Sequence, residues 1–484
     1  MLGRLRTQHD FWDAQLYERA IPEDHLLRRI DEFVDFSFVE EETSDLYCSD
    51  NGRPSYAPEQ LFRVMFVSYL YNLSDVRVVQ ELRYNLLYRY FCRFSLSDDT
   101  PDDTTLVVFR ARLGEERFRR LFDRIVKQAA ELGLLTERRK IIDATVIRAD
   151  VALKNRVELL RQGRRRVIRE VAARCPERAA ALERFSSSAD KEGLSREEIV
   201  IQEEELTEEM LGALSDVDDD KVRFWAEQLR KVKDGEGGVA SFVDPDCRWG
   251  YKKKGEPFLG YKAHVSCDGS GIVTSAQLLA GNEPEGEHME DLLDEDRRKG
   301  IRARSVTADK AYDSARNRER IRAEGMRPEI PSRHSAKLAR KFRYRPRKDC
   351  FLCPAGKETI GKTPHSRGGD LYYFSEHDCS NCQLKETCLG KAETRKRVYL
   401  SERARETLVQ WYEIRGALKE RKKIERKFGE AKWWHRMDRS QYRGRWRVAI
   451  GMLMTFMVLN AKRIVRLIRQ NAAPGARELA RATC

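Results

Sequence analysis

Hydrophobic residues recur at helical spacing through the first part of the chain. One helix is expected to begin near Pro58, because proline is favoured in the first turn of a helix. Ser74 is a candidate N-cap for a second helix over 75–94, and two further helices are expected on either side of Gly114. Short helices joined by tight polar turns are typical both of helix-turn-helix packing and of an ordinary helical bundle. Residues 1–135 are therefore predicted to form a helical domain.

The pattern changes at residue 137, where the segment ERRKIIDATVIRADVALK is rich in β-branched residues bracketed by charge. This composition predicts a buried strand. The later elements are expected from the same kind of pattern. They are a hairpin over 257–281 that turns at Asp268-Gly269-Ser270-Gly271, short strands over 305–309 and 326–333, and helices over 401–470.

A highly charged, amphipathic stretch separates the first strand from the hairpin, which predicts a mostly helical insertion. Within it, thirteen acidic and two basic residues lie between Asp190 and Asp220. The chain is thus expected to be a mixed α/β protein. Its expected divisions are a helical N-terminal domain (1–135), the first strand (136–151), the charged insertion (152–238), the rest of the sheet (239–334), a Cys-rich insertion (335–400), C-terminal helices (401–470) and a tail (471–484).

The charge balance points to a polyanionic partner. The 484-residue chain has a net charge of +13, and 41% hydrophobic with 35% charged residues fits a soluble folded protein. The stretch from Trp411 to Gln470 carries seventeen Lys or Arg against five Asp or Glu, which favours DNA binding by the C-terminal region and by the N-terminal helices.

The sequence gives no sign of membrane insertion or secretion. The longest apolar run, Val448 to Asn460, is too short to span a bilayer and is expected to be a buried helix. No apolar segment typical of a signal peptide is seen at the start. We therefore expect a cytoplasmic, nucleoid-associated protein with no membrane partner.

Three carboxylates occupy unusual positions. Asp143 lies inside the apolar first strand, where a buried charge is costly unless it is compensated. Asp309 ends the strand 305–309, and ligand sites gather at such strand ends. Glu425 shares one face of a late helix with Arg421 and Lys432, at spacings of four and seven residues.

These carboxylates suit phosphodiester chemistry. Two divalent cations can activate a nucleophile and stabilise the leaving oxygen together, and Mg²⁺ (or Mn²⁺) prefers carboxylate oxygens. Taken singly, Asp143 fits an edge or capped carboxylate, Asp309 a helix cap and Glu425 a surface ion pair. Their occurrence together, in this order and on these elements, favours a site with two metal ions.

The motifs IIDATVIRAD, TADKAYDS and RKKIERKFGEAK together resemble the DDE transposases of bacterial insertion sequences. GRPSYAPEQLFRVMFVSYL through VVFRARLG is similar to the helical N-terminal domain of that family, and DPDCRWGYKKKGEPFLGYKAHVSCDGSGIVTSAQLLAGN to its middle sheet. The resemblance covers most of the chain and is weakest over 152–238. It implies a ribonuclease-H-like catalytic core whose acidic triad falls on Asp143, Asp309 and Glu425.

The resemblance extends to a Tyr-Arg-Glu-Lys signature on the last helix. Arg421, Glu425 and Lys432 match it, whereas Leu418 stands at the tyrosine position. Arg421 and Lys432 are expected nearest the reacting phosphate. Arg443 and Arg445 are expected to grip the flanking DNA backbone.

The cysteines predict a second, structural metal. Two CxxC pairs, Cys350 with Cys353 and Cys379 with Cys382, flank a Gly- and Pro-containing loop, which is typical of structural zinc. Cys388 is an alternate ligand. In related transposases a Cys-rich segment lies between the last strand and the Glu helix, as it does here. We expect one Zn²⁺ per chain in a small zinc knuckle.

The sequence thus predicts a Mg²⁺-dependent transposase that binds the terminal inverted repeats of its element, hydrolyses phosphodiester bonds and joins 3′-OH ends to target DNA. Its expected partner is double-stranded DNA, on which it would assemble as a homodimer. A ribonuclease-H-like nuclease without strand transfer and a non-catalytic DNA-binding relative are the alternatives.

Overall fold

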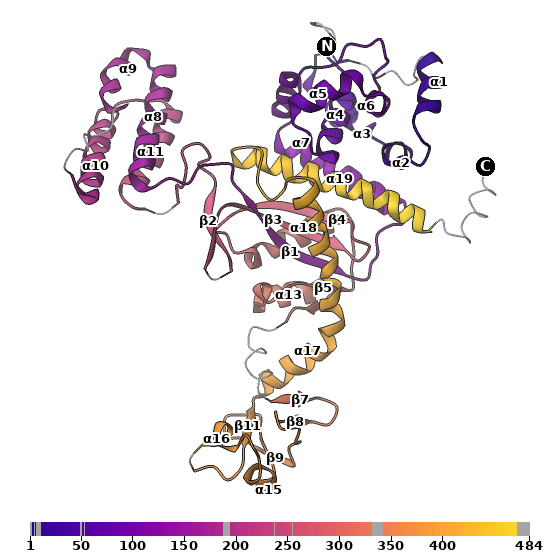
Figure 1. Ribbon diagram of the computed structural model, residues 1–484, viewed down its shortest axis with the longest axis vertical. Coiled ribbons are helices and arrows are strands. Elements are labelled where there is room, and N and C mark those ends of the chain that lie inside the picture. Colours follow the sequence, from indigo (N-terminus) through magenta and orange to yellow (C-terminus); the bar gives the residue numbers. More distant parts are fainter. Residues whose placement is uncertain are drawn as a thin grey trace.

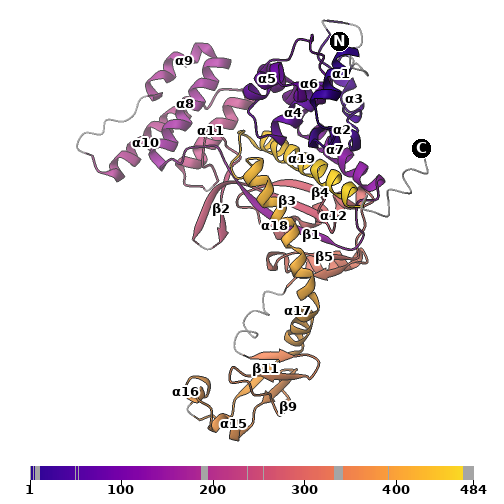
Figure 2. The same cartoon turned by 45° about the vertical axis from the view of Figure 1, so that its right-hand side comes forward.

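A computed structural model of the chain describes residues 2–3, 5, 11–48, 51–52, 54–186, 194–236, 238–253, 255–331, 342–390 and 392–471. The predicted tail lies outside these residues except for Asn471. A central sheet carries the N-terminal helices above it, a helical unit to one side, and a small Cys-rich unit that hangs below on a long helix (Figure 1). The view in Figure 2 shows the same separation of the two outer units from the centre.

The first third of the chain is helical, as predicted. Helix α4 begins at Pro58, and the Ser74 side chain accepts a hydrogen bond from the Arg77 N–H at the start of α5. The prediction of a single helix over 75–94 is wrong, because Asn85 ends α5 and caps α6 with its own side chain. Gly114, with φ of 65°, interrupts α7 where we expected one helix to end and another to begin. The helices are α1 (Phe11–Ala20), α2 (Leu26–Phe33), α3 (Phe38–Glu41), α4 (Pro58–Leu70), α5 (Asp75–Tyr84), α6 (Leu86–Phe91) and α7 (Asp103–Glu131).

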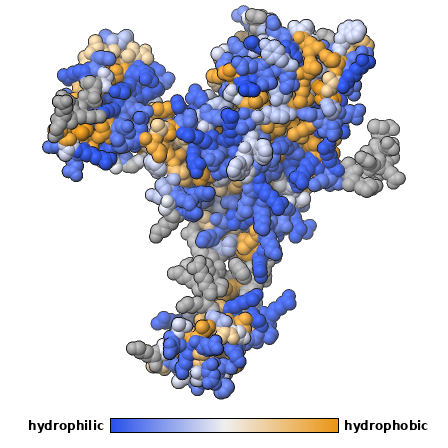
Figure 3. Space-filling model, viewed as in Figure 1, coloured by the Kyte–Doolittle hydropathy of each residue, from blue (hydrophilic) through white to orange (hydrophobic). Residues whose placement is uncertain are grey.

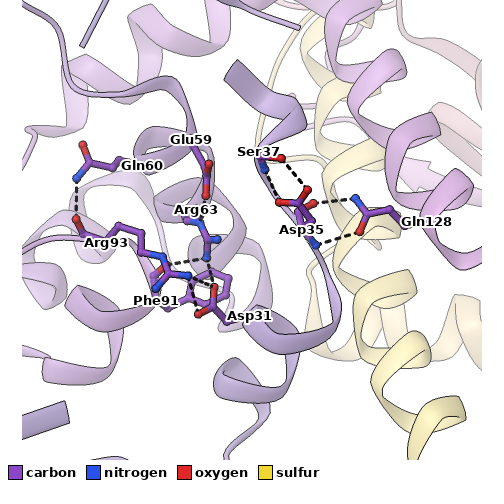
Figure 4. A network of polar contacts seen from close by, with 9 residues as sticks. All are labelled: Asp31, Asp35, Ser37, Glu59, Gln60, Arg63, Phe91, Arg93 and Gln128. Atoms are coloured by element: carbon purple, nitrogen blue, oxygen red, sulfur yellow. Dashed lines mark hydrogen bonds and ion pairs between the residues drawn. The ribbon is translucent and has the colours of Figure 1, made fainter. Parts of the chain in front are cut away.

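A buried charge network holds these helices together (Figure 4). The Arg63 guanidinium donates to Asp31 at 2.6 Å, to Glu59 at 2.7 Å and to the Phe91 carbonyl at 3.0 Å. The guanidinium carbon of Arg63 also lies 4.6 Å from the Phe36 ring centroid. All of its polar contacts are internal, so the loss of Arg63 would leave the buried Glu59 carboxylate without its cation and would leave Asp31 with Arg93 alone.

The sheet has the order β4-β3-β1-β5-β6, with β3 antiparallel to β1 and with β5 and β6 parallel to it. Strand β2, which the sequence pattern did not predict, pairs with the first residues of β3 on the edge that β4 continues. A Cβ at Gly260 of β3 would lie 2.2 Å from the Ile147 carbonyl oxygen of β1. The close approach of these two strands therefore requires glycine at this position. The strands are β1 (Lys140–Arg148), β2 (Arg248–Lys253), β3 (Glu256–Asp268), β4 (Val273–Ala280), β5 (Ser305–Thr307) and β6 (Arg327–Glu329). This mixed sheet is a ribonuclease-H-like core.

Helices cover both faces of the sheet. One face packs against α12 (Met289–Arg298) and α13 (Ala315–Ala323). The other shares a continuous core with α18 (Lys422–Trp434), α19 (Arg445–Asn471) and the N-terminal helices. The Asn460 side chain of α19 donates to and accepts from the backbone of Val273, which ties this helix to β4.

Helix α19 contains the apolar run 448–460, which is buried as predicted. By length and composition it could cross a membrane, but 83% of its most apolar window is buried inside the protein. The helix contacts α2, α4 and α7 on one side and β4 on the other. It therefore joins the N-terminal helices to the central sheet.

The charged insertion forms a helical unit with a hydrophobic core of its own. This unit is larger than a simple helical hairpin. Fully buried Arg164 donates to the carboxylate and carbonyl of Glu203 and to Thr207, so its charge is compensated inside the unit. The helices are α8 (Arg156–Arg174), α9 (Pro176–Leu182), α10 (Arg196–Gly212) and α11 (Asp220–Lys233).

The Cys-rich unit is built from short strands around a small aromatic core. The side chain of Asp349 accepts hydrogen bonds from Tyr344 and Tyr372, which lie in that core. Helix α17 (Glu402–Glu420) leads back to the sheet, and its break at Arg421 begins α18. The other elements of the unit are β7 (Arg343–Arg345), β8 (Cys350–Leu352), β9 (Gly361–Pro364), β10 (Asp370–Tyr373), α15 (Glu376–Ser380), α16 (Lys385–Cys388) and β11 (Arg397–Leu400).

Replacing Arg63 with Met should lower the free energy of unfolding by roughly 3–5 kcal/mol, because Glu59 would remain buried without its cation and Asp31 would keep only its ion pair with Arg93. Arg77→Ala is the control. Its ion pair with Glu81 is exposed and should be worth less than about 1 kcal/mol. Urea unfolding of both variants measures the difference, and equal losses would contradict the role of the network.

Candidate active site and nucleic-acid interface

The register of two parallel strands brings Asp143 and Asp309 together. In the β1–β5 pair, Ile141 lies opposite Thr307. Asp143 is two residues beyond Ile141, and Asp309 is two residues beyond Thr307. Because side chains alternate along strands, both carboxylates lie at the same edge and on the same face. Asp309 follows the end of β5, and its side chain also accepts a hydrogen bond from the Ala311 N–H.

Helix α18 brings Glu425 and Arg421 to the same place. Ile424, Phe428 and Ala431 bury one face of the helix in the core, and α18 contacts β1 directly. Arg421, at the start of α18, donates to the Asp143 carboxylate at 2.8 Å. Glu425 is exposed one turn further on. The face of α18 that carries Arg421 therefore contacts β1, the strand that carries Asp143.

The electrostatics of Asp143 show how closely these groups interact. Burial raises the pKa of Asp143 above its usual value, and the Asp309 carboxylate acts in the same direction, whereas Arg421 opposes both. Burial alone would lower the pKa of Arg421, but Asp143, Asp309 and Glu425 raise it. Arg421 is thus the cation that compensates the carboxylates.

The described residues do not by themselves form a metal site. No group of three or more His, Cys, Asp or Glu side chains among them is arranged to hold a metal ion. The donor set still suits Mg²⁺, since Asp143, Asp309 and Glu425 offer only carboxylate oxygens. The partner of Asp143 in this structure is the Arg421 guanidinium.

Lys432 lies away from the three carboxylates. Its ammonium group is 3.6 Å from the Asp438 carboxylate. Burial lowers the pKa of Lys432, and the cations Lys252 and Arg148 act in the same direction. Lys432 thus belongs to a positive cluster with Lys252 and Arg148, at the end of β1.

Arg443 and Arg445 extend this positive surface. Arg443 donates to the Asp150 carbonyl at 3.1 Å, and Arg445 lies 3.6 Å from the Glu283 carboxylate. Both side chains are about half exposed, at 54% and 48%. The ion pairs of Arg443 with Asp150 and of Arg445 with Glu283 are exposed and therefore weak, so both guanidinium groups stay open to an anionic partner.

Two family models match the chain. Residues 15–112 match a transposase domain (DUF772), and residues 228–461 match a transposase DDE domain, so together they cover more than half of the sequence. The chain belongs to the DDE transposases of insertion sequences. No solved structure matches it. The DDE match begins at residue 228, inside helix α11 of the charged insertion, so it contains Asp309 and Glu425 but not Asp143.

The transposase gathers a different set of cysteines from the predicted one. Cys353, Cys379, Cys382 and Cys388 line one cavity of the Cys-rich unit. Burial raises the pKa of Cys388, and the other three thiols act in the same direction. Cys350 lies in β8, where its charged neighbours are Glu358, Asp349, Lys348 and Arg345. Cys388 thus lines this cavity and Cys350 does not, and no three of the described thiols are arranged to hold a metal ion.

Two buried residues behind the site were not predicted. Tyr312 and His264 stack with ring centroids 5.7 Å apart, and neither the Tyr312 hydroxyl nor the His264 Nε2 has a hydrogen-bond partner among the described residues. Burial lowers the pKa of His264 to about 3, so this ring is neutral. On the surface, the Nδ1 atom of His288 lies 3.2 Å from the Asp291 carboxylate.

The transposase should be more stable when Asp143 is replaced with Asn. Because burial raises the pKa of Asp143, its ionised form costs stability at neutral pH. In metal-free buffer at pH 7, Asp143→Asn should raise Tm. The gain should shrink as the pH falls and the wild-type carboxyl is protonated.

Asp216→Asn is the control, because Arg178 lowers the pKa of that exposed carboxyl. It should not raise Tm. A melting series in pH would refute the assignment of Asp143 if Asp143→Asn were no more stable than wild type at pH 7.

Proposed function

We propose that this transposase binds the terminal inverted repeats of its insertion sequence, cleaves phosphodiester bonds by two-metal hydrolysis and transfers the 3′-OH ends to target DNA. The observation that carries the proposal is the strand register that sets Asp143 beside Asp309, with Arg421 reaching Asp143 from the Glu425 helix. Family membership supplies the reaction class.

Each residue of the site has a proposed role. Asp143, Asp309 and Glu425 would hold two Mg²⁺ (or Mn²⁺) ions, whose chemistry is to activate the attacking oxygen and stabilise the leaving oxygen. Arg421 compensates the carboxylates in free protein and is placed to bind the reacting phosphate. Lys432 binds a phosphate further along the strand, in the positive cluster with Lys252.

We assign the remaining surfaces by charge. The N-terminal helices share the core of the catalytic sheet, so DNA bound by them would keep a fixed relation to the site. Arg443 and Arg445 would grip the flanking backbone. Recognition of two transposon ends favours a homodimer assembled on DNA, in the cytoplasm and associated with the nucleoid.

Asp143→Asn should abolish cleavage and leave binding of the ends largely intact. The amide keeps the side-chain shape but loses the charge that a cation needs. Loss of an outer-shell partner of a metal costs about 10- to 100-fold, so loss of a ligand should cost more. The assay uses duplex DNA with the terminal sequences that flank the gene, in Mg²⁺, with Asp216→Asn as the control.

Pre-cleaved ends separate the alternatives. Joining of 3′-OH ends to a target plasmid supports transposition, whereas cleavage without joining would identify a ribonuclease-H-like nuclease. Binding without either reaction would identify a non-catalytic relative. Cleavage by Asp143→Asn at the wild-type rate would remove Asp143 from the mechanism.

We further propose that Cys353, Cys379, Cys382 and Cys388 draw together around one structural Zn²⁺, because the described thiols are not arranged to hold a metal ion on their own. The fit rests on the shared cavity and on backbone N–H donors, since Lys357 donates to the Cys353 sulfur and Leu384 to the Cys382 sulfur. Such donors stabilise the thiolates that zinc binds. The ion would tie the loop after β8 to α15 and α16.

Purified transposase should contain one zinc ion per chain by elemental analysis. Cys388→Ser should lose most of it, and Cys350→Ala, the matched control, should retain it. Protein without zinc would contradict the site. Equal loss in both variants would contradict the choice of Cys388 over Cys350.

Arg443→Ala combined with Arg445→Ala should weaken binding to all DNA sequences alike. The plot of log affinity against log salt should flatten by roughly one unit for each lost phosphate contact. Arg178→Ala, on the helical insertion, is the control. If the double variant lost only its preference for the transposon ends, with an unchanged salt slope, these residues would be reading bases.

A further inference from the structure

Two strongly exposed tryptophans stand at the end of the catalytic helix. Trp433 and Trp434 are 84% and 70% exposed, directly after Lys432 in α18. No ring or hydrogen-bond contact within the described part of the chain involves either indole. Neither tryptophan belongs to the buried face of α18 or to an ion pair of the helix, so packing gives no reason for an indole at either position.

Helix geometry separates the two tryptophans. With 3.6 residues per turn, Trp433 lies about 80° around the helix from Glu425, whereas Trp434 lies about 180° from it. The rise from Glu425 to Trp433 is about 12 Å. Trp433 is therefore beside the catalytic face, and Trp434 is on the opposite side of the helix.

A second strip of side chains runs beside the catalytic one. Lys422, Arg426 and Trp433 each follow directly after Arg421, Glu425 and Lys432, so they repeat the spacing of four and seven residues. Lys422 and Arg426 are exposed and have no ion pair among the described residues. The surface over α18 is largely hydrophilic (Figure 3). The strip thus offers two free cations and then an exposed indole.

We propose that this strip binds unpaired nucleotides next to the reacting phosphate, with Trp433 stacking on one of their bases. The proposal rests on the proposed function, which places a phosphate at Arg421 and Glu425. Cations that follow the backbone and an aromatic ring that stacks on a base are how proteins hold single-stranded DNA. A base inside a duplex is covered on both faces by its neighbours, so a protruding indole can stack only on an unpaired or terminal base.

The test compares two DNA probes with the full-length Asp143→Asn protein, which should bind without cutting. One probe is the fully paired transposon end, and the other is the same end with three unpaired nucleotides beside the cleavage site. Stacking of one base should favour the second probe on the order of tenfold. Trp433→Ala should lose this preference but bind the paired probe as before.

Two variants complete the design. Trp434→Ala, which removes a neighbouring indole on the other side of the helix, should keep the preference, and Trp433→Phe should restore most of it. The fluorescence of a 2-aminopurine in the unpaired stretch should be quenched by the protein that retains Trp433. The same probe should stay bright when it is bound by Trp433→Ala.

The outcomes separate this inference from the proposed function. If neither probe is bound, the proposed function fails. If both probes are bound alike by the protein with Trp433 and by Trp433→Ala, the stacking role is overturned while DNA binding stands. Loss of the preference in Trp434→Ala instead would place the bases on the other side of the helix and would also overturn it.

Discussion

The burial of the Asp143 carboxylate is the constraint around which the neighbouring elements are arranged. A carboxylate within the central strand is mostly removed from water, and burial raises its pKa even with a guanidinium 2.8 Å away. A positive group must therefore reach β1 from elsewhere in the chain. The break between α17 and α18 at Arg421 places that group, and the buried face of α18 holds it against the strand.

The same packing explains how three distant segments form one site. Strand β1 precedes the charged insertion, β5 follows it, and α18 comes after the Cys-rich unit (Figure 1). The continuous core beneath them includes the N-terminal helices and α19, so the sheet, the last helices and the first domain pack as one body. The two insertions have separate cores, so they add to the chain without disturbing the strand register.

Charge is arranged differently on the two sides of α18. The strip of Arg421, Glu425 and Lys432 faces β1 and the positive cluster, and most of its charges have partners within the protein. The neighbouring Lys422 and Arg426 face water. One strip of α18 thus has cations that are paired within the protein, and the neighbouring strip has cations that are left free.

Local patterns in the sequence determined where many of the helices, strands and turns form. β-Branched residues around Asp143, the Gly-rich hairpin turn, Pro58 and the Arg421–Glu425 spacing all act over a few residues, so they could be recognised without the fold. The tertiary structure decided what depends on distant partners. Strand β2 forms on the free edge of β3, Lys432 pairs with Asp438 rather than joining the carboxylates, and Cys388 rather than Cys350 lines the cavity that holds the other three cysteines. In each case the partner of a residue or strand depends on which distant segments pack together. The spacing of residues along the chain carries no information about that packing.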